Sequence, residues 1–533
     1  MPPLTRRPEL QAAARLLVFL VVVSLLLAPL APRTAQATPA ASPADAPAMA
    51  IGRDSRFGLN EAWRAADQAD RAGAGWSRIL FWWSEMQKDG PGDLNLFATD
   101  QDSFINSEVG RGRMLAGGVL NTAPWASTDG SRNGVPKGLY LPWDHPDNVW
   151  GQFMRLMAEH YAGKIDTWII WNEVDISHGQ WATWNGSLED YVQLQKVAYK
   201  AIKAGNPNAT VLPFGAAWWY DYGKTITQML DIIKADPDAA ANNYYFDVAN
   251  LHLYSRAADI PRIVSWYRNE LAIRGMSKEI WIGETNAIPY DDPIWNAGRG
   301  NFRATMDEQA SYMIEAFATY VGMNVQRVSV NRAIDGTDFE AGGEPFGLIR
   351  NDGSTRPAYT AYSVVTRYFG GVREASFTHD DNSGVSKVTM QRPGEKVTVL
   401  WTMSGGGVTT SIDAMGAQAL KVNKWGDASP IQASGGKFTI DLSGAAANPG
   451  SADRTDFAVG GEPVILVERT DGNVMAAFRS LDENPVPGLG TGTEAAASAI
   501  DPPKTATPSK SKATPTPTPK KPTPTPTPTP KKR

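Results

Sequence analysis

Two glutamates in the sequence each end a short run of apolar residues. Glu173 stands next to Asn172 just after the run 167–171, and Glu284 directly follows the run 280–283. Short runs rich in β-branched and aromatic residues predict strands that are buried on both faces. Carboxylates at the carboxyl ends of such strands meet at one shared face of an α/β barrel. A pair of carboxylates there can act as acid/base and nucleophile on a single glycosidic bond.

The composition narrows the chemistry that the chain can perform. Cysteine is absent, which excludes disulfides, thiolate nucleophiles and cysteine-ligated metals. The five histidines form no HExxH-type pair, so no histidine-based metal site is expected. A net charge of −5 is small for 533 residues and indicates no nucleic-acid partner. The 18 tryptophans exceed ordinary usage; most should be core, and the others offer flat apolar faces for sugar rings.

The middle of the chain alternates short apolar runs with amphipathic stretches, which predicts a parallel sheet with crossover helices. Two of the helical stretches are 150–161 and 307–320. Residues 53–371 therefore predict an α/β (β/α)8 TIM barrel. A doubly wound open sheet is the main competitor, but no glycine-rich phosphate loop supports it. The eight candidate strands are 57–59, 77–82, 113–120, 167–171, 210–214, 248–253, 279–283 and 327–330.

After Gly370-Gly371 the pattern changes to short strands separated by Gly, Asp and Ser turns. Residues 372–470 therefore predict a C-terminal all-β sandwich domain. A structural support for the barrel is favoured over sugar binding, because Trp401 and Trp425 are its only tryptophans. The candidate strands are 388–390, 397–401, 409–412, 421–422, 438–442 and 464–467.

The N-terminal end has the composition of a targeting segment. Residues 1–37 place basic residues before an apolar run from Leu16 to Leu30 and finish with small residues, which predicts a signal peptide cleaved after Ala37. An uncleaved anchor is the alternative, although the run is shorter than the roughly 20 residues of a spanning helix. Residues 38–52 are rich in Ala and Pro and predict a disordered leader. We expect a secreted or cell-surface protein.

The C-terminal end, residues 471–533, predicts a disordered tail. From about Leu481 the sequence consists mainly of Pro, Thr, Ala and Lys, which favours extended polyproline II and cannot bury a core. Its basic residues suit contact with an anionic cell wall, and a solvated spacer without a partner is the equal alternative. These basic residues are Lys520, Lys521, Lys531, Lys532 and Arg533.

The ordered set of strand-end residues resembles the retaining glycoside hydrolases of clan A. The set consists of Asn172-Glu173 after the fourth strand, His252 and Tyr254 after the sixth, and Glu284 after the seventh. Within that clan three stretches are most similar to family 39, with family 5 as its neighbour. They are RILFWWSEMQ from Arg78, WIIWNEVD from Trp168, and FGLIRNDGSTRPAYTAY from Phe346.

The resemblance implies a role for each residue of the set. Glu173 would be the acid/base and Glu284 the nucleophile of a double displacement. Asn172 would donate to the 2-hydroxyl of the sugar. His252 would bind sugar hydroxyls or orient the acid/base. Arg78 and Tyr254 would hydrogen-bond the nucleophile and favour its charged form.

Further substrate-binding candidates surround this set. Asn60 and Trp125 match positions that shape the glycone pocket in the family, and Trp171 and Trp295 are candidates for stacking on sugar. The sequence also departs from the family's pattern. Many clan members place a Trp at the end of the eighth strand, whereas this chain has Val330-Asn331-Arg332. A platform for the sugar must therefore come from elsewhere or be absent.

Together these expectations describe a secreted retaining glycoside hydrolase that cleaves β-glycosidic bonds of a polysaccharide or oligosaccharide. It would need neither metal nor organic cofactor, and its partner would be carbohydrate, with no stable protein partner. Two alternatives use the same residues: a barrel that binds carbohydrate without turnover, and a cell-wall transglycosylase. The sugar, whether xyloside, glucoside, mannoside or uronide, stays open.

Overall fold

The computed structural model describes residues 53–92, 101–179, 181–296, 303–336, 345–446 and 459–482. The predicted signal peptide and leader, and the predicted tail beyond residue 482, lie outside these residues. No helix in the described part of the chain has the length and apolar composition that a membrane span requires. Apart from the start of the tail, the domain boundaries drawn from the sequence remain predictions.

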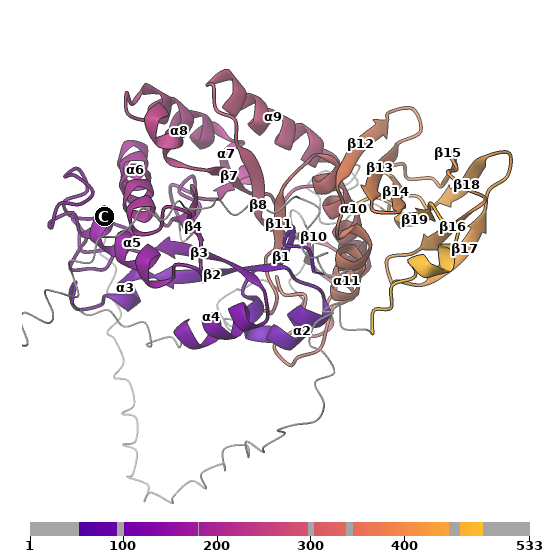
Figure 1. Ribbon diagram of the computed structural model, residues 1–533, viewed down its shortest axis with the longest axis horizontal. Helices are drawn as coiled ribbons and strands as arrows, with labels where there is room; N and C mark the ends of the chain where they lie inside the picture. Colours follow the sequence, from indigo (N-terminus) through magenta and orange to yellow (C-terminus); the bar gives the residue numbers. More distant parts are fainter. Residues whose placement is uncertain are drawn as a thin grey trace, which may run out of the picture. The chain divides into compact units, whose positions relative to one another are not determined.

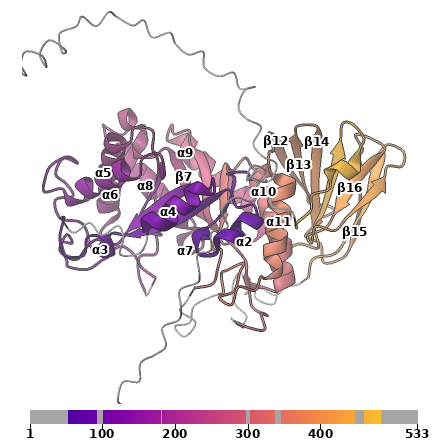
Figure 2. The same ribbon diagram turned by 60° about the horizontal axis from the view of Figure 1, so that its bottom comes forward.

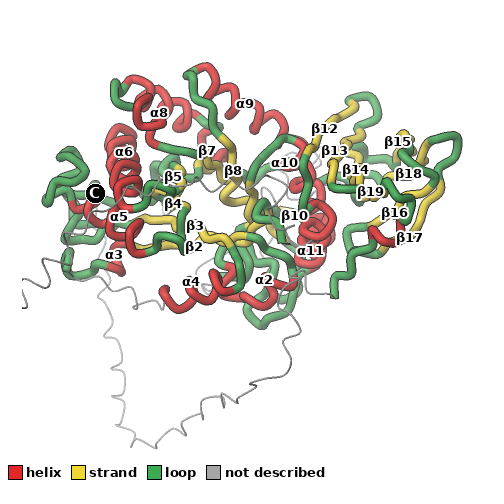
Figure 3. The backbone as a smooth tube through the Cα atoms, viewed as in Figure 1, coloured by secondary structure: helices red, strands yellow, loops and turns green. Residues whose placement is uncertain are grey.

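A ring of parallel strands forms the centre of the first part of the chain, with helices around it (Figures 1 and 3). The strands pair in the order β5-β4-β3-β2-β1-β11-β8-β7-β6, and every pair is parallel. Their bounds are β1 Phe57–Leu59, β2 Trp76–Trp82, β3 Met114–Leu120, β4 Thr167–Ile170, β5 Thr210–Leu212, β6 Ala216–Ala217, β7 Val248–His252, β8 Glu279–Thr285 and β11 Arg327–Val330.

The two outer members of this order, β5 and β6, are halves of one barrel strand. Only residues 213–215 separate them, and β5 pairs with β4 while β6 pairs with β7. The break falls at Pro213, which has no N–H for the ladder, and near Gly215. Counting β5 and β6 as one strand gives eight positions that close on themselves, so the predicted (β/α)8 barrel is confirmed.

Helices and short strands connect the barrel strands. Two long helices begin with a capping box, formed by Ser187 with Asp190 and by Thr305 with Glu308. In each pair, the side chain of either residue accepts a hydrogen bond from the backbone N–H of the other. The helices are α2 Ala66–Arg71, α3 Trp83–Met86, α4 Gln101–Gly110, α5 Val149–His160, α6 Leu188–Gly205, α7 Trp218–Asp221, α8 Lys224–Ala235, α9 Ile260–Ile273, α10 Met306–Gly322 and α11 Pro357–Phe369. The 3-10 turns are η1 Ala62–Ala65, η2 Ala240–Tyr245 and η3 Ala257–Asp259, and the short strands β9 Ile288–Pro289 and β10 Arg303–Ala304 pair with each other.

The rest of the chain forms antiparallel sheets, which confirms the β domain after the barrel. A six-stranded sheet has the order β12-β13-β14-β19-β16-β17, and β15 pairs with β18 in a second sheet. Leu400 and Leu466 on the large sheet pack with Phe438 and Ile440 of β18, as in a sandwich. The bounds are β12 Glu374–Asp380, β13 Val385–Arg392, β14 Glu395–Thr402, β15 Val408–Asp413, β16 Gln418–Val422, β17 Ala428–Gln432, β18 Lys437–Leu442 and β19 Val464–Arg469.

One hydrophobic core runs from the barrel into this β domain. Trp401 and Ile465, on the other face of the large sheet, belong to the same buried cluster as Phe317 of α10. Helix α10 is buried along nearly its whole length, and it lies beside β12, β13 and β14 (Figures 1 and 2). Polar contacts cross this boundary as well: Glu315 accepts from the Gly460 N–H at 3.0 Å, and Lys424 pairs with Asp307 at 2.8 Å.

The structure corrects the sequence prediction at three elements of the β domain. The strands β12 and β17 were not predicted, because their exposed faces break the apolar pattern. The predicted start of the tail at 471 comes too early. Residues Val474–Ala477 form the 3-10 turn η5 with Val474 and Ala477 buried, and Arg367 donates to the carbonyls of Ser480 and Leu481.

Candidate active site

The two predicted glutamates meet at the carboxyl ends of the barrel strands, with a histidine between them. Glu173 follows β4, Glu284 lies near the end of β8, and His252 ends β7. One side-chain ligand atom from each of the three residues lies within 4.8 Å of the others. The His252 Nδ1 is 2.8 Å from Glu173 Oε1 and 3.7 Å from Glu284 Oε1. The residues that the sequence placed far apart therefore form one cluster.

Glu284 is the more enclosed of the two carboxylates. Its side chain is 9% exposed, Arg78 on β2 donates to Oε1, and the Tyr254 hydroxyl donates to Oε2 at 2.6 Å. Burial alone would disfavour the charge, but Arg78, His252 and the Tyr254 hydroxyl outweigh it and hold the pKa of Glu284 well below its usual value. A permanently ionised carboxylate in this position is suited to nucleophilic attack.

Tyr254 is oriented by Asn331, which follows the eighth barrel strand. The Asn331 side chain, at the end of β11, donates to the Tyr254 hydroxyl at 2.8 Å. Burial and the negative charge of Glu284 raise the pKa of Tyr254 well above its usual value, so that its hydroxyl keeps the proton that it donates. Asn331, at the strand end where the sequence lacks a tryptophan, thus supplies an orienting hydrogen bond to the hydroxyl that donates to Glu284.

Glu173 sits in a more open environment on a constrained backbone. Its side chain is 19% exposed, about twice the value for Glu284. Glu173 has a φ of 43°, in the left-handed region that non-glycine residues rarely adopt. Its carbonyl accepts from the Ile176 N–H at 3.1 Å, and the neighbouring Asn172 side chain lies 3.4 Å from Oε2. The turn therefore projects a carboxyl that can exchange protons with substrate and water.

Two glycines make room for His252. A Cβ atom on Gly215 would lie 2.0 Å from His252 Nε2, and one on Gly283 would lie 3.3 Å from the same atom. The first distance is far inside contact range, so the position between β5 and β6 has no space for a side chain. His252 itself is fully buried and also lies 3.4 Å from an Arg78 nitrogen. Sequence reasoning did not single out Gly215, because its role depends on a residue of another strand.

We expect the Gly215→Ala variant to displace the His252 ring from Glu173. Small displacements of catalytic groups can cost about 100-fold in rate, so kcat/KM should fall by about 10- to 100-fold. Steady-state kinetics on an aryl glycoside would measure the loss, with circular dichroism and Tm to confirm folding. Gly90→Ala is the matched control, since a Cβ there meets nothing within 4 Å. Unchanged kinetics in a folded Gly215→Ala protein would contradict this role for the glycine.

The other predicted residues lie around the cluster in different ways. Asn60 is fully buried, donates to the Gly283 carbonyl at 3.0 Å and accepts from the Ser329 hydroxyl at 2.9 Å, so that it braces the backbone before Glu284. Trp125 is half-buried, and its indole N–H donates to the Gln87 carbonyl at 2.6 Å. Trp295 is half-buried beyond β9, next to a segment outside the described residues.

The prediction that Trp171 stacks on a sugar is wrong. Its side chain is 1% exposed, its indole N–H donates to the Thr183 carbonyl at 3.0 Å, and its ring packs edge-on against Trp184 at 5.0 Å. A ring enclosed in this way has no face left for a sugar. The position just before Asn172 therefore carries a core side chain that supports the turn of Glu173.

Asp175 is a buried carboxyl two residues beyond Glu173, on the loop after β4. It is 3% exposed. Burial raises the pKa of Asp175 to about 7, and the negative charges of Glu173 and Asp221 act in the same direction. The sequence alone gives no sign of this, since Asp175 lies in a segment without regular periodicity.

Glu173, His252 and Glu284 also have the side-chain types of a metal site. The guanidinium of Arg78 already supplies positive charge to Glu284, and Tyr254 occupies its second oxygen. A divalent cation would have to displace or repel these donors. The donor set fits a carboxylate pair with an orienting histidine better than it fits a metal ion.

We expect the Tyr254→Phe variant to raise the pKa of Glu284 by removing a donor to its charged form. In the wild type the lowered pKa of Glu284 also stabilises the folded state at pH values above the pKa of this group in the unfolded chain. That contribution to stability is lost as pH falls through the folded-state pKa of Glu284. The acidic limb of the kcat/KM profile should move to higher pH, with about a 10- to 100-fold loss at the optimum, as for a hydrogen bond to a charged group. An unmoved limb would contradict this role.

The control for this variant is Tyr140→Phe. The Tyr140 hydroxyl also donates to a carboxylate, Asp190, at 2.7 Å, but it is exposed and outside the cluster. Its loss should leave the pH profile unchanged.

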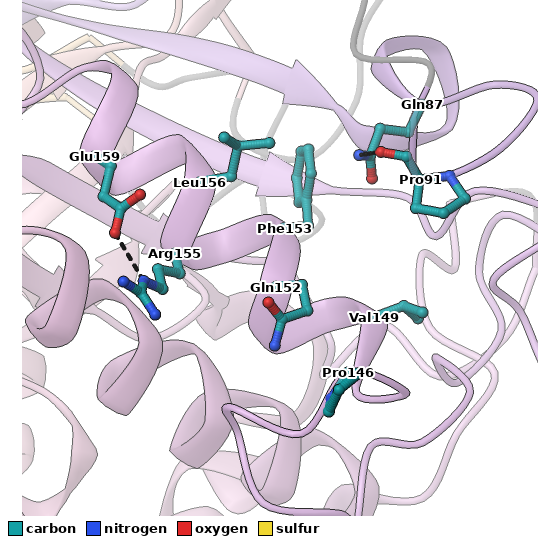
Figure 4. Close-up of a pocket in the computed structure, with 9 residues that line it drawn as sticks. All are labelled: Gln87, Pro91, Pro146, Val149, Gln152, Phe153, Arg155, Leu156 and Glu159. Carbon is teal, nitrogen blue, oxygen red and sulfur yellow. Dashed lines mark hydrogen bonds and ion pairs between the residues drawn. The ribbon is translucent and has the colours of Figure 1, made fainter. Parts of the chain in front are cut away.

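A hollow lies beside α5, lined by Phe153 and Leu156 and by Gln87 and Pro91 of the facing loop (Figure 4). Arg155 donates there to Glu159 at 2.7 Å. Among the residues that the structure describes, none of this lining bonds to Glu173, His252 or Glu284. The hollow is therefore separate from the cluster.

Comparison with solved structures places the chain among glycoside hydrolase folds. A family 39 glycoside hydrolase from the gut symbiont Bacteroides cellulosilyticus WH2 is similar at 15% identity over 79% of this chain and 82% of that chain, with a TM-score of 0.57. A glucosidase from Croceicoccus marinus matches at 14% over 76% and 91%, with a TM-score of 0.53. A family 30 endoxylanase from Clostridium papyrosolvens C71 matches at 14% over 79% and 98%, with a TM-score of 0.51.

At identities this low the likeness shows the fold, and at that level it confirms the resemblance to the clan A barrels. No model of a protein family matches the sequence, and the search of curated proteins found no match.

Proposed function

We propose that this protein is a secreted retaining β-glycosidase that acts on a polysaccharide or on oligosaccharides released from it. The observation that carries the proposal is the approach of Glu173 and Glu284, each with a carboxylate oxygen within 4.8 Å of the other, at the mouth of the barrel. Carboxyl groups about 5–5.5 Å apart are typical of retention, whereas inversion needs about 6.5–9.5 Å to admit a water molecule.

The surroundings of the two carboxylates support separate roles. Glu284, ionised and held by Arg78 and Tyr254, attacks the anomeric carbon and forms a glycosyl ester. Glu173 protonates the departing oxygen and then deprotonates the water that cleaves the ester. His252 bonds Glu173 at 2.8 Å and orients it between the two steps. Asn172 beside it is placed to meet a sugar hydroxyl.

A mechanism-based label tests the nucleophile directly. A panel of 2-deoxy-2-fluoro-glycosyl fluorides with gluco, xylo and manno configurations should add one sugar mass to the peptide that contains Glu284. Proton NMR of the first product should show retained β configuration. A label on another residue, or an inverted first product, would overturn the proposal. Absence of turnover with intact sugar binding would instead indicate the binding-only barrel.

Transglycosylation is distinguished by products. Chain-length analysis with and without added acceptor sugars shows whether water or a second sugar takes up the glycosyl group.

Export rests on residues 1–37 and is tested separately. Expression of the whole chain in a host with a secretion pathway should release protein whose N-terminal sequence starts after Ala37. Protein retained in the membrane with Leu16 to Leu30 intact would support the anchor instead.

A further inference from the structure

The loop that carries Glu173 continues into a group of aromatic side chains at the mouth of the barrel. We call His178, Trp219 and Tyr220 the aromatic platform. His178 lies five residues beyond Glu173 in the loop after β4. Trp219 and Tyr220 lie in α7, which directly follows β6. Both segments follow carboxyl ends of barrel strands, so the platform and the catalytic pair lie at the same end of the barrel.

A hydrogen bond and ring contacts join the aromatic platform across the two segments. The Tyr220 hydroxyl lies 2.5 Å from His178 Nδ1, and the two rings are 5.5 Å apart. The rings of Trp219 and Tyr220 stand nearly perpendicular at 5.7 Å. The buried Asp175 lies on the same loop as His178, and the negative charges of Glu173 and of Asp221 in α7 both raise its pKa beyond the effect of burial. The platform is thus tied to the segment that positions the acid/base.

The platform leaves a large apolar face in water. Trp219 is 40% exposed, and His178 is exposed as well. In the same helix the neighbouring Trp218 is only 7% exposed and packs on Trp266 at 4.8 Å, so that α7 buries one indole and presents the other. An exposed indole beside the polar edge of a His–Tyr pair offers an apolar face together with hydrogen-bonding groups. A sugar ring has the complementary surface, C–H groups on its face and hydroxyls on its rim.

The roles proposed for the two carboxylates indicate which side of the scissile bond the aromatic platform serves. The donors to Glu284 come from β2 and from the segment after β7, and Asn331 at the end of β11 holds one of them. The platform instead extends from the segment of Glu173, which protonates the leaving oxygen. Among the described residues, its side chains have no bond to Glu284 or to those donors. The platform therefore shares its chain segment with Glu173 and not with the groups that hold Glu284.

From this geometry we infer that the aromatic platform binds a sugar unit on the leaving-group side of the scissile bond, with Trp219 stacked on the ring. The inference rests on the proposed function and deepens it. The substrate is then a β-linked oligosaccharide or polysaccharide with at least one sugar on each side of the cleaved bond, rather than a glycoside of a small alcohol.

The test compares two substrates that share one glycone. The glycosyl fluoride has a single fluorine atom as leaving group and leaves the platform empty, whereas the matching oligosaccharide places a sugar on it. The Trp219→Ala variant should lose about 10-fold or more in kcat/KM on the oligosaccharide, in line with the stacking and burial of an aromatic face. It should keep its kcat/KM on the glycosyl fluoride and its rate of labelling by the 2-deoxy-2-fluoro-glycosyl fluoride. Trp219→Phe should recover most of the loss, because it restores a flat ring.

The outcomes separate the inference from the proposed function. An equal loss on both substrates, or no loss on either, overturns the platform as a binding site for the leaving sugar. Tyr140→Ala, which removes an exposed aromatic side chain outside the platform, should lower neither rate. If wild-type Glu284 is not labelled and neither substrate is cleaved, the proposed function fails and the inference falls with it. If Glu284 is labelled but the Trp219→Ala variant loses kcat/KM equally on both substrates, only the inference fails and the proposed function stands.

Discussion

Replacing Glu284 by Gln is expected to lower kcat by about 10^4-fold or more, because the amide cannot form the glycosyl ester and only binding and proton transfer remain. The variant keeps the volume of the side chain and can still accept from Tyr254. It loses the charge that pairs with Arg78, so some loss of stability is expected along with the loss of turnover. Kinetics on the aryl glycoside with the best leaving group, together with Tm, measure both effects.

The control for this variant is another buried glutamate. Burial raises the pKa of Glu315 to about 8, so that it is mostly protonated and neutral at pH 7. Glu315→Gln therefore replaces one neutral group by another and should preserve activity. Turnover of Glu284→Gln within 10-fold of the wild type, after deamidation has been excluded by mass spectrometry, would reject Glu284 as the nucleophile.

Replacing Glu173 by Ala is expected to lower kcat/KM most for substrates whose leaving group must be protonated to depart. General acid catalysis contributes about 10^2- to 10^4-fold, so kcat/KM should fall by that factor on oligosaccharides, whose leaving groups are poor. A dinitrophenyl glycoside should be attacked at nearly the wild-type rate, because its leaving group departs without protonation. The glycosyl ester on Glu284 then accumulates, since no base activates water. A burst of dinitrophenol followed by slow turnover measures this split.

Azide completes the test of Glu173. It needs no deprotonation and fits the space left by the removed carboxylate, so it should restore turnover of the dinitrophenyl glycoside and yield the β-glycosyl azide. Asp221→Ala is a useful comparison, because the Asp221 carboxylate accepts from the Gly223 and Thr225 N–H groups and, among the described residues, bonds to no member of the cluster. A uniform loss on all substrates without azide rescue would assign Glu173 a structural role instead.

The cluster of Glu173, His252 and Glu284 could be predicted from sequence because each member lies at or just beyond the carboxyl end of a strand. Glu173, His252 and Glu284 all follow apolar runs whose β character is strong, and a parallel barrel brings such ends to one face whatever its loops do. The same regularity explains the placement of Arg78 within β2. Sequence reasoning is reliable here because the fold, rather than any local interaction, determines the geometry.

The remaining details depend on contacts between strands and loops that no local pattern encodes. Trp171 and Trp219 are both tryptophans near strand ends, yet packing against Trp184 buries the first, and the helical turn of α7 exposes the second. The support that Asn331 gives to Tyr254 joins two strand ends, and the need for glycine at 215 comes from His252 on the next strand. Such pairwise relations require coordinates.

Helix α10 has a consequence for anyone who would shorten or recombine this protein. One side of α10 contacts the β domain: Ser311 bonds Lys424, Glu315 bonds Gly460, and Gly322 lies against Phe377. The other side contacts the barrel, because the hydroxyls of Tyr312 and Tyr320 bond Thr285 of β8, the residue after Glu284. A protein truncated after Gly371 would lack the β-domain contacts on one side of α10, the helix that packs against β8 and so supports Glu284. Chimeras should therefore exchange the barrel and its β partner as a single cassette.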